Sequence, residues 1–359
     1  MDDQATAVQR VSPEVLHAFI QRAFECVGLP SGDAAICAEL MARADVNGSD
    51  GHGVFRLPQY IRRISGGAVN VRPNVRIVQE AAAMAVVDGD NGMGHVVMHF
   101  ATETAIRKAK TAGVAWVGVR WSNHAGPASL YASMPLQHDM IGLYLAVGSA
   151  NHLPAWGGLD MLLSTNPIAV AIPAREEQDI VLDMATTVAA YGKVKTKAQR
   201  GEMMPEGWMI DRRGAPLTDP KRSDEGFLLP IGGYKGYGLA LVFGLLAGTL
   251  NGAAMGRDVV DFNNDDSTPT NTGHAIMAID LAAFGEVEAF KRRVDTMIRD
   301  LHASERMPGV EAIRIPGEGS HRAREDRAQN GVPIPNALRA ALDKLAIELA
   351  IQPLASVSL

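Results

Sequence analysis

Hydrophobic positions at helical spacing organise the first 65 residues of the chain. Ser12-Pro13 has the form of a helix N-cap followed by proline at the first helical position, and large apolar side chains follow at intervals of four or five residues. A second helix is predicted from residues 31–33 to the turn signal Asn47-Gly48. The stretch SDGHGVFRLPQY therefore follows a helix end, where side chains can converge on a site.

From about residue 82 the pattern changes to short apolar runs that alternate with helices. A helix is predicted after the glycine-rich loop 92–94 and ends at Gly113, and leucines at helical spacing predict a last helix from Asn336. Strands interleaved with helices favour a layered α/β core. The predicted strands lie within residues 83–90, 114–119, 140–148, 167–173, 179–185 and 274–281.

The longest uncharged run, residues 236–256, is long enough to raise the question of a membrane span. Six glycines interrupt it, and no aromatic belt or flanking basic cluster supports insertion. We therefore predict a buried helix from Lys235. Its small residues Gly236, Ala240, Gly244 and Gly248 recur every four positions, so adjacent members share a face on which a neighbouring backbone can come close.

Composition narrows the class of protein. The chain has 359 residues, a formal net charge of −6, 47% hydrophobic residues and 21% charged residues. This balance predicts a globular protein without the basic footprint of nucleic-acid binding. The basic run at 193–200 is interpreted as a solvated helix face, with contact to a cofactor phosphate as the alternative. Two cysteines and a polar N-terminus without a signal-peptide pattern favour the reducing cytoplasm.

Two common kinds of enzyme site lack their sequence patterns. No HExxH is present, and the cysteines do not have zinc-ligand spacing. His95 and His99 lie one helical turn apart without an acidic residue beside them, so we expect structural or surface roles and no metal. No serine has glycine two residues before and two residues after it, which argues against a nucleophile elbow.

A histidine and an arginine within SDGHGVFRLPQY form the first candidate site. His52 lies between two glycines, and Arg56 follows four residues later. A guanidinium binds a carboxylate through two hydrogen bonds, and a histidine beside it can exchange a proton with a neighbouring oxygen. The pair suits an acid with a carbonyl or hydroxyl at C2, although spacing alone leaves packing roles open.

A second histidine and a glycine-rich turn add further candidates. His124 lies in SNHAGP, where Pro127 is predicted to open a helix whose positive end would keep the imidazole neutral. No complete GxGxxG follows a strand. Gly232, Gly233 and Lys235 do precede the apolar helix, where backbone N–H groups form either a phosphate site or a plain tight turn.

Several ordered motifs together resemble the type-2 malate/lactate dehydrogenase family of NAD(P)-dependent oxidoreductases. This family includes ureidoglycolate dehydrogenase, a diketogulonate reductase, a sulfolactate dehydrogenase and reductases of cyclic imino acids. The resemblance covers nearly the whole chain. It rests on DGHGVFRLPQY, DGDNGMGHVV, SNHAGPASLY, STNPIAVAIP, VLDMATTVAAYGKV, PEGWMID, GGYKGYGLAL and IPGE.

The resemblance implies an α/β fold whose dinucleotide-binding sheet domain is not of the Rossmann type. That NAD(P)-binding domain is expected at residues 77–280, and a mostly helical substrate and dimerisation domain at residues 1–76 with 281–359. The resemblance further implies a homodimer with the active site between domains. It implies NAD or NADP as the cofactor, with NAD favoured, and a small 2-hydroxy or 2-oxo acid as the substrate. No nucleic-acid or membrane partner is expected.

The resemblance also implies roles for individual residues. His52, His124 and Asp183 match catalytic positions, and Arg56, Tyr60 and Ser149 are expected to contact the substrate. The expected cofactor contacts are Asp183, Met184, Ala185, Lys235, Gly236, Pro316, Gly317 and Glu318.

One departure from the family pattern bears on the reaction. Imine reductases of the family carry a serine just before the motif histidine, in a serine–histidine–aspartate relay, and this chain has Gly51 there. We therefore predict hydride transfer between NAD(P) and C2 of a 2-hydroxy/2-oxo acid of the malate, lactate or ureidoglycolate type. Reduction of the C=N bond of a cyclic imino acid is the alternative, and a dinucleotide-binding regulator without turnover is the remote one. Trp121 is a second difference and is expected to narrow the pocket near His124.

Overall fold

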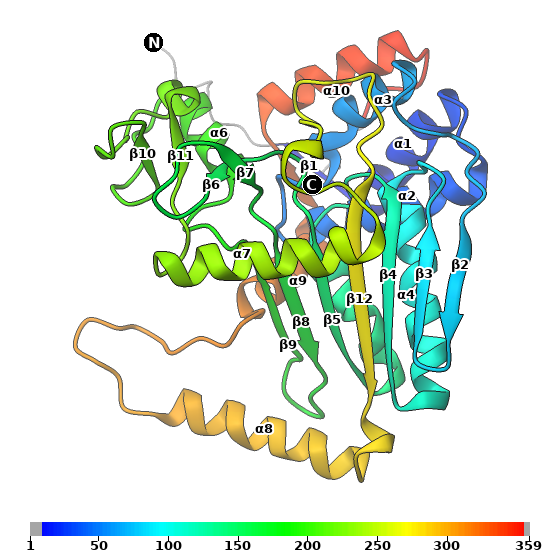
Figure 1. Cartoon of the computed structure of the whole chain (residues 1–359), viewed down its shortest axis with the longest axis vertical. Coiled ribbons are helices and arrows are strands. Elements are labelled where there is room, and N and C mark those ends of the chain that lie inside the picture. The colour runs from blue at the N-terminus through cyan, green and yellow to red at the C-terminus, as the bar shows by residue number, and fades with distance from the viewer. Residues whose placement is uncertain (1–8, 355–359) are drawn as a thin grey trace.

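A seven-stranded sheet lies at the centre of the protein (Figure 1). The computed structural model describes residues 9–354, without the side chains of residues 199 and 200. In spatial order the strands are β2 (Arg76–Ala81), β3 (Met84–Asp88), β4 (Val114–Ser122), β12 (Thr272–Asp280), β5 (Met140–Ala146), β8 (Ile168–Ile172) and β9 (Ile180–Met184). Neighbouring strands are antiparallel throughout, except that β3 and β4 run parallel.

The mixed α/β class and the six predicted strands are confirmed. The largely antiparallel sheet differs from the parallel, doubly wound sheet on which Rossmann domains are built. β2 escapes prediction because most of its residues are exposed at the sheet edge, so no alternating apolar pattern marks it. The polar N-terminal stretch that gave no signal-peptide pattern lies almost entirely outside the described residues.

Helices cover both faces of the sheet. α4 (Gly94–Ala112) and the short α5 (Ser129–Ser133) pack on one face, and α7 (Tyr234–Ala247) crosses the other (Figure 1). α4 turns fully buried Val97, Ala101, Ala105 and Ala109 toward the strands, as its spacing predicts. Gly113 ends this helix with a φ of 79°, which glycine adopts at little cost.

The prediction of a buried α7 is wrong for half of its surface. The small residues at every fourth position are buried. Their small size is required, since a side chain at Gly244 would collide with Met255 and Asn166. The opposite face exposes large apolar side chains, among them Val242 and Leu245. The glycine stripe therefore serves close packing inside the protomer. Within residues 9–354, no helix is long and apolar enough to cross a membrane.

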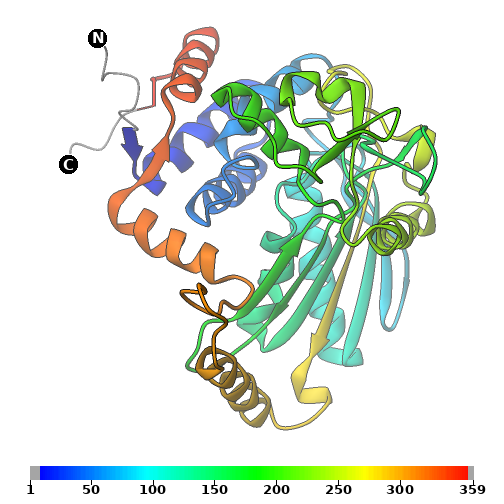
Figure 2. The same ribbon diagram turned by 90° about the vertical axis from the view of Figure 1, so that its left-hand side faces the viewer.

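A helical region stands at one end of the sheet. It comprises α1 (Pro13–Cys26), α2 (Ser31–Val46) and α3 (Leu57–Ser65) with the C-terminal α10 (Asn336–Glu348), which share one hydrophobic cluster. The strands β1 (Gln9–Val11) and β13 (Val332–Ile334) pair antiparallel and join the two ends of the chain. Figure 2 shows α10 and α9 (Glu318–Asn330) on the side of the molecule where α1 lies. The domain boundaries themselves stay a prediction.

A small lobe lies beside the first turn of α7 (Figure 1). It contains the hairpin of β6 (Leu153–Pro154) and β7 (Met161–Leu163), the pair β10 (Met209–Asp211) and β11 (Gly226–Leu228), and α6 (Tyr191–Arg200). The 3-10 turns of the chain are η1 (Val54–Arg56), η2 (Met134–His138), η3 (Pro220–Glu225), η4 (Thr249–Asn251), η5 (Gly256–Asp258) and η6 (Leu281–Ala283).

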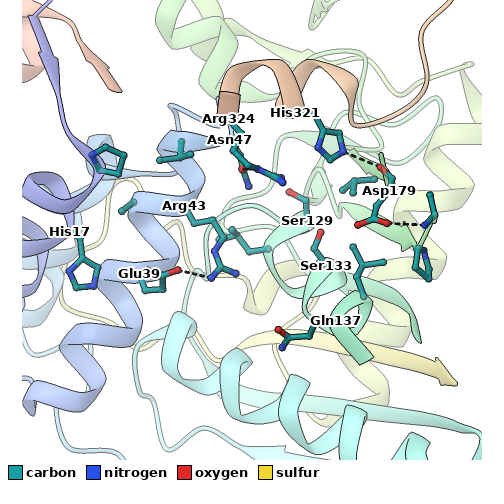
Figure 3. A pocket seen from close by; sticks show the side chains of 18 of the residues that line it. His17, Glu39, Arg43, Asn47, Ser129, Ser133, Gln137, Asp179, His321 and Arg324 are labelled. Carbon is teal, nitrogen blue, oxygen red and sulfur yellow. Dashed lines mark hydrogen bonds and ion pairs between the residues drawn. The ribbon is translucent and has the colours of Figure 1, made fainter. Parts of the chain in front are cut away.

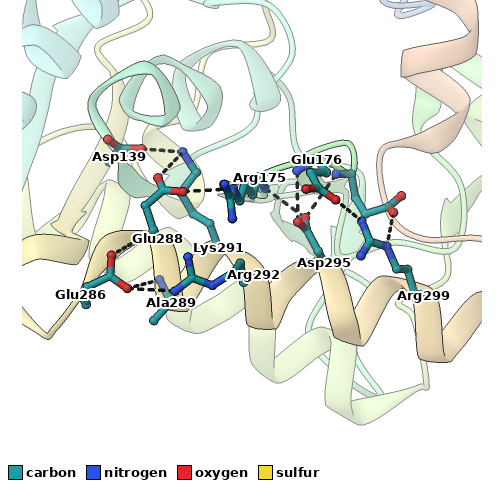
Figure 4. A network of polar contacts seen from close by, with 11 residues as sticks. Asp139, Arg175, Glu176, Glu286, Glu288, Ala289, Lys291, Arg292, Asp295 and Arg299 are labelled. Carbon is teal, nitrogen blue, oxygen red and sulfur yellow. Dashed lines mark hydrogen bonds and ion pairs between the residues drawn. The ribbon is translucent and has the colours of Figure 1, made fainter.

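α8 (Val287–Ala303) lies at the opposite end of the sheet from the N-terminal helices and is attached largely by polar contacts (Figure 4). The Asp295 carboxylate accepts hydrogen bonds from the backbone N–H groups of residues 175–177, in the turn between β8 and β9, at 3.0–3.2 Å. Arg299 pairs with Glu176 and Glu177 of the same turn. These bonds lower the pKa of Asp295 against the opposing effect of burial, so the carboxylate stays charged.

Candidate active site

A cavity of about 880 Å³ lies between the α2–α3 segment, the ends of β4, β5 and β9, α6 and the first turn of α9. Its volume is within the range of small-molecule and cofactor sites. Some predicted residues do not line it: Tyr60, Lys235, Gly236, Pro316 and Glu318. Those that do are His52, Arg56, His124, Ser149, Asp183, Met184, Ala185 and Gly317.

The loop that carries His52 is shaped by a buried carboxylate. Asp45, near the end of α2, accepts the backbone N–H of Val54 at 2.7 Å, where η1 begins. Gly53 must lack a side chain, because a Cβ there would lie 2.0 Å from that carboxylate. The His52 N–H also donates to the Ser49 carbonyl at 2.8 Å. These contacts hold the His52 side chain at the cavity wall.

Arg56 is oriented by three hydrogen bonds from two of its nitrogens. Nε donates to the Gly51 carbonyl at 3.0 Å, and Nη1 donates to Gln59 Oε1 at 2.7 Å and to Asn263 Oδ1 at 3.3 Å. No residue in the described part of the chain accepts from Nη2, and none forms a salt bridge with Arg56. The guanidinium therefore presents an unused edge at a cavity that His52 also lines.

His124 is held by a buried tyrosine behind it. The Tyr60 hydroxyl lies 2.5 Å from His124 Nδ1, and the Gly126 N–H donates to the same nitrogen at 3.4 Å. Burial raises the pKa of Tyr60, so its hydroxyl stays protonated and donates. Nδ1 is thus the acceptor, and the neutral imidazole carries its proton on Nε2. Tyr60 is 2% exposed and does not line the cavity. It therefore contacts His124, and His124 is the residue that lines the cavity.

The cause predicted for the neutral state of His124 needs correction. Pro127 does not open a helix: α5 begins at Ser129 and has only five residues, too few for a strong dipole. Burial and, after it, the charge on Arg56 lower the pKa of His124 well below its usual value. Trp121 is also misjudged: it is 42% exposed and does not line the cavity.

His52 stacks on His124, with ring centroids 5.8 Å apart and an angle of 14° between the ring planes. Neither ring nitrogen of His52 has a hydrogen-bond partner among residues 9–354, so both are available to a ligand. Burial and the charge on Arg56 lower the pKa of His52 to about 4, which leaves it neutral at neutral pH. His95 contacts Tyr60 edge-on and is fully buried, as a structural role requires.

The expected residues on β9 also line the cavity. Asp183 accepts the backbone N–H of Ser129 at 2.8 Å and has no hydrogen bond to His52. Burial raises its pKa, although the carboxylate is still open to the cavity. Ser149 follows β5 and also faces the cavity. The two histidines and Arg56 thus form one group, to which Asp183 makes no hydrogen bond.

The first turn of α9 has the features of an anion site. Gly317, Gly319 and Ser320 line the cavity, and a Cβ at Gly319 would meet nothing within 4 Å. No described residue accepts from the backbone N–H groups of Gly319 and Ser320. Free N–H groups at the positive end of a helix fit the pyrophosphate of a dinucleotide. Glu318 itself bonds the Ile315 N–H at 3.0 Å, away from the cavity.

The glycine-rich turn before α7 takes the form of a tight turn. Gly232 and Gly233 have positive φ values of 57° and 66°, and the Gly236 N–H bonds back to the Ile231 carbonyl at 2.9 Å. Lys235 is exposed outside the cavity. Cofactor contact through Lys235 and Gly236 stays a prediction.

Three cavity residues were not among the candidate site residues of the sequence: Lys195, Phe262 and Asn263. Lys195 of α6 faces the cavity, whereas the basic run was interpreted as a solvated face, with contact to a cofactor phosphate as the alternative. Its Nζ lies 3.3 Å from Asn263 Oδ1, in an irregular segment that also supplies Phe262. Phe262 is 1% exposed and stacks on His124 at 5.0 Å. No periodic pattern marks this segment, so only the fold brings it to the site.

A second cavity, of about 860 Å³, lies between α1, α2, α5 and α9 (Figure 3). Its polar groups bond one another: Arg43 pairs with Glu39, Arg324 with Asn47, and His321 with the Asp179 carbonyl. Most of its charged groups thus have partners, unlike the unused edge of Arg56 in the first cavity. In the part of the chain that the structure describes, no three histidine, cysteine or acidic side chains gather as metal ligands would.

Comparisons with known proteins agree with the fold and the cavity. A family model described as malate/L-lactate dehydrogenase matches residues 11–343. The malate dehydrogenase of Pyrococcus horikoshii is 36% identical over 353 residues, covering 96% of this chain and 97% of that protein. The L-sulfolactate dehydrogenase of Methanocaldococcus jannaschii is 39% identical over 324 residues, covering 90% and 92%. A solved structure of that organism's sulfolactate dehydrogenase has a TM-score of 0.90 at 36% identity, covering 97% of this chain and all of that one.

Two further relatives widen the range of reactions. A ureidoglycolate dehydrogenase (NAD(+)) of Escherichia coli K12 is 32% identical and covers 90% of this chain and 92% of that protein. A delta(1)-pyrroline-2-carboxylate/delta(1)-piperideine-2-carboxylate reductase of Pseudomonas putida is 32% identical, with 92% and 94% covered. The matches make the chain a nicotinamide-dependent dehydrogenase. It belongs to the malate/L-lactate dehydrogenase family, and the resemblance of its motifs is confirmed.

Proposed function

We propose that the enzyme transfers a hydride between NAD(P) and C2 of a small 2-hydroxy/2-oxo acid. The observation that carries this proposal is the unused edge of Arg56 in the same cavity as two neutral histidines. A carboxylate beside a C2 oxygen is the substrate feature that such a group recognises.

Arg56 binds the C1 carboxylate in this proposal. Its Nη2 is free, and its position is fixed by Gly51, Gln59 and Asn263. The bound geometry therefore requires little reordering of the arginine. Burial lowers the pKa of Arg56, but a guanidinium remains charged at every physiological pH.

The two histidines have different roles at C2: one transfers the proton, and the other donates a hydrogen bond. In the oxidation direction, a free ring nitrogen of His52 accepts the hydroxyl proton, and in reduction it returns one. His124 donates Nε2–H to the C2 oxygen, because Tyr60 and Gly126 occupy its Nδ1. A neutral imidazole held in one tautomer orients this oxygen and stabilises negative charge that develops on it.

The nicotinamide cofactor, when bound, carries the hydride. Its pyrophosphate would lie at the first turn of α9, at the N–H groups of Gly319 and Ser320. Asp183, Met184 and Ala185 line the cavity between that turn and the histidines, which supports their expected cofactor contacts. We favour NAD over NADP, because the motif VLDMATTVAAYGKV resembles the ureidoglycolate branch and that relative is named for NAD(+).

The experiment that tests this proposal is a turnover screen with both cofactors, followed by the absorbance of the reduced nicotinamide. Its panel contains malate, lactate, ureidoglycolate and sulfolactate, their 2-oxo partners, and cyclic imino acids. Turnover of a 2-hydroxy/2-oxo pair is the expected result. Turnover of the cyclic imines alone would overturn the proposal.

We also propose that two copies pair through the outer face of α7. Leu239, Val242 and Leu245 are 39%, 49% and 43% exposed there, and the β6–β7 hairpin beside them exposes Trp156 and Leu159. An apolar patch of this kind favours burial against a second copy. Val242→Glu should halve the molar mass measured by light scattering, and an unchanged mass would contradict this interface.

A further inference from the structure

A second cation shares an anchor with Arg56. Lys195 Nζ and Arg56 Nη1 each lie 3.3 Å from the same oxygen, Asn263 Oδ1. The two charged groups are therefore within two hydrogen-bond lengths of each other. They reach this point from α6 and from η1, which are more than a hundred residues apart in the chain.

The anchoring oxygen has a fixed direction. Asn263 donates its backbone N–H to Asp261 Oδ1 at 2.8 Å and its Nδ2 to the same oxygen at 3.2 Å. Because Nδ2 is used in this way, Oδ1 must face the two cations. The Asp261 carboxylate also accepts from Asn264 at 2.7 Å, so its oxygens are bound to amides.

The two cations lack ion-pair partners in the described part of the chain. Neither Arg56 nor Lys195 forms a salt bridge with a carboxylate among residues 9–354, whereas Lys197, two residues further along α6, pairs with Glu202 at 2.7 Å. Burial and the charge on Arg56 lower the pKa of Lys195, and Asp261 offsets only part of this effect. Two like charges kept close, with only a partial counter-charge from Asp261, favour a ligand that brings its own negative charge.

A ligand with a single carboxylate would bind Arg56 and leave the charge of Lys195 without a partner on the ligand. Arg56 has a free edge for the C1 carboxylate, and Lys195 has donors beyond its bond to Asn263. Lys195 also lies over the Tyr191 ring at 5.5 Å, which holds the ammonium at the cavity wall without neutralising it. A second acid group two or three bonds from C1 falls within the span of the two cations.

We propose that Lys195 selects dianionic substrates, by binding the second acid group of a three- or four-carbon 2-hydroxy/2-oxo acid whose C1 carboxylate binds Arg56. The second group is a carboxylate or a sulfonate. This assignment rests on the proposed function, since it uses the same cavity and the same C1 contact. The preference for dianionic over monoanionic substrates should therefore depend on the charge of the side chain at residue 195.

The test compares Lys195→Met with Lys197→Met. Both remove one positive charge from α6, but Lys197 lies outside the cavity and pairs with Glu202. Initial rates are measured with oxaloacetate and 3-sulfopyruvate as dianions and pyruvate as the monoanion. Lys195→Met should lower kcat/KM for the dianions by about 10- to 100-fold, the effect of losing one charge-assisted contact, and change that for pyruvate by less than about threefold. Lys195→Arg should restore part of the loss, and Lys197→Met should follow the wild type.

Two results would overturn the assignment. An equal loss for pyruvate and the dianions would mean that both cations bind one carboxylate. A raised KM for the cofactor alone would place a cofactor phosphate at Lys195.

Calorimetry separates this inference from the proposed reaction. Tartronate, a dianion, and glycolate, the monoanion with one carboxylate fewer, are titrated into the enzyme with reduced cofactor, where neither acid can be oxidised. Tighter binding of tartronate that disappears in Lys195→Met supports the assignment even if no acid is turned over. Equal affinity for both acids in the wild type contradicts it even if turnover is found.

Discussion

The packed wall around His124 differs from more open residues of the same cavity in how firmly the chain holds them. On the packed wall Tyr60 and Phe262 are 2% and 1% exposed and pack around His124, while three hydrogen bonds fix Arg56. Of the more open residues, Asp183 is exposed to the cavity, and Lys195, which shares Asn263 with Arg56, is half-buried on α6. The comparison teaches that the groups proposed for the chemistry are set in a packed core, whereas the groups proposed for cofactor and substrate choice lie on a more open surface.

The largest expected effect comes from the packed wall. Arg56→Lys removes the planar edge that binds a carboxylate through two bonds, so kcat/KM should fall roughly 100- to 1,000-fold. The dissociation constant of the cofactor, measured by fluorescence titration, should change less than about twofold, because the hydrogen bonds of Arg56 go to Gly51, Gln59 and Asn263 and not to α9. Arg62→Lys, at an exposed position of α3, is the matched control. Equal losses of substrate and cofactor binding would contradict the role of Arg56.

The protonation of His52 should appear in the rate of oxidation at low pH. Burial and Arg56 lower its pKa to about 4, so the free enzyme keeps a neutral base down to that pH and loses it below. A bound carboxylate offsets the charge of Arg56 and raises the pKa of His52 in the complex. In the oxidation direction, the acid limb of kcat should therefore lie at higher pH than that of kcat/KM, which should lie near pH 4. A limb of kcat/KM at the ordinary histidine value would contradict this account.

Tyr60→Phe tests the support behind His124. It removes the hydroxyl that bonds Nδ1 and leaves only the longer bond from Gly126. We expect kcat to fall about 5- to 30-fold, as for one lost hydrogen bond of about 1–2 kcal/mol. KM for the substrate should change little, because the hydroxyl does not line the cavity. A rise in KM with unchanged kcat would show instead that Tyr60 contacts the substrate.

The smallest expected effect on the main reaction comes from Gly51→Ser. A Cβ at Gly51 meets nothing within 4 Å, so the serine fits. Activity on 2-oxo acids should stay within about twofold and stability within about 0.5 kcal/mol. Reduction of cyclic imines should rise relative to that of 2-oxo acids, because the serine restores the hydroxyl of the imine-reductase pattern. Gly51→Ala is the control, and equal behaviour of the two variants would remove the hydroxyl from the explanation.

Periodicity predicted the elements of the core and failed where exposure or tertiary contact decides. The helices up to Asn47 and the six strands follow from apolar spacing, because their buried faces repeat along the chain. The same reasoning overestimated the burial of α7, since an apolar helix is buried on both sides only if something covers its outer face. It also placed a helix at Pro127, where the chain continues as a loop to Ser129.

Only part of the site was predicted from the sequence, and that part came from motifs and not from apolar spacing. His52 and Arg56 are close in sequence, so one motif shows both, and the family resemblance supplied His124 and Asp183. Lys195 and Asn263 converge only in the folded chain, and neither stands in a motif. The packing of Phe262 on His124 is likewise a contact between distant segments. Such residues require the structure.

Hydride transfer to C2 can be followed with an isotope label on the cofactor. The 2-oxo acid that the screen identifies is reduced with a cofactor deuterated at C4 of the nicotinamide, and the product is examined by NMR. If the enzyme transfers hydride to C2, the 2-hydroxy acid should carry one deuterium at C2, from one of the two C4 faces. A product without deuterium at C2 from either face would contradict this transfer.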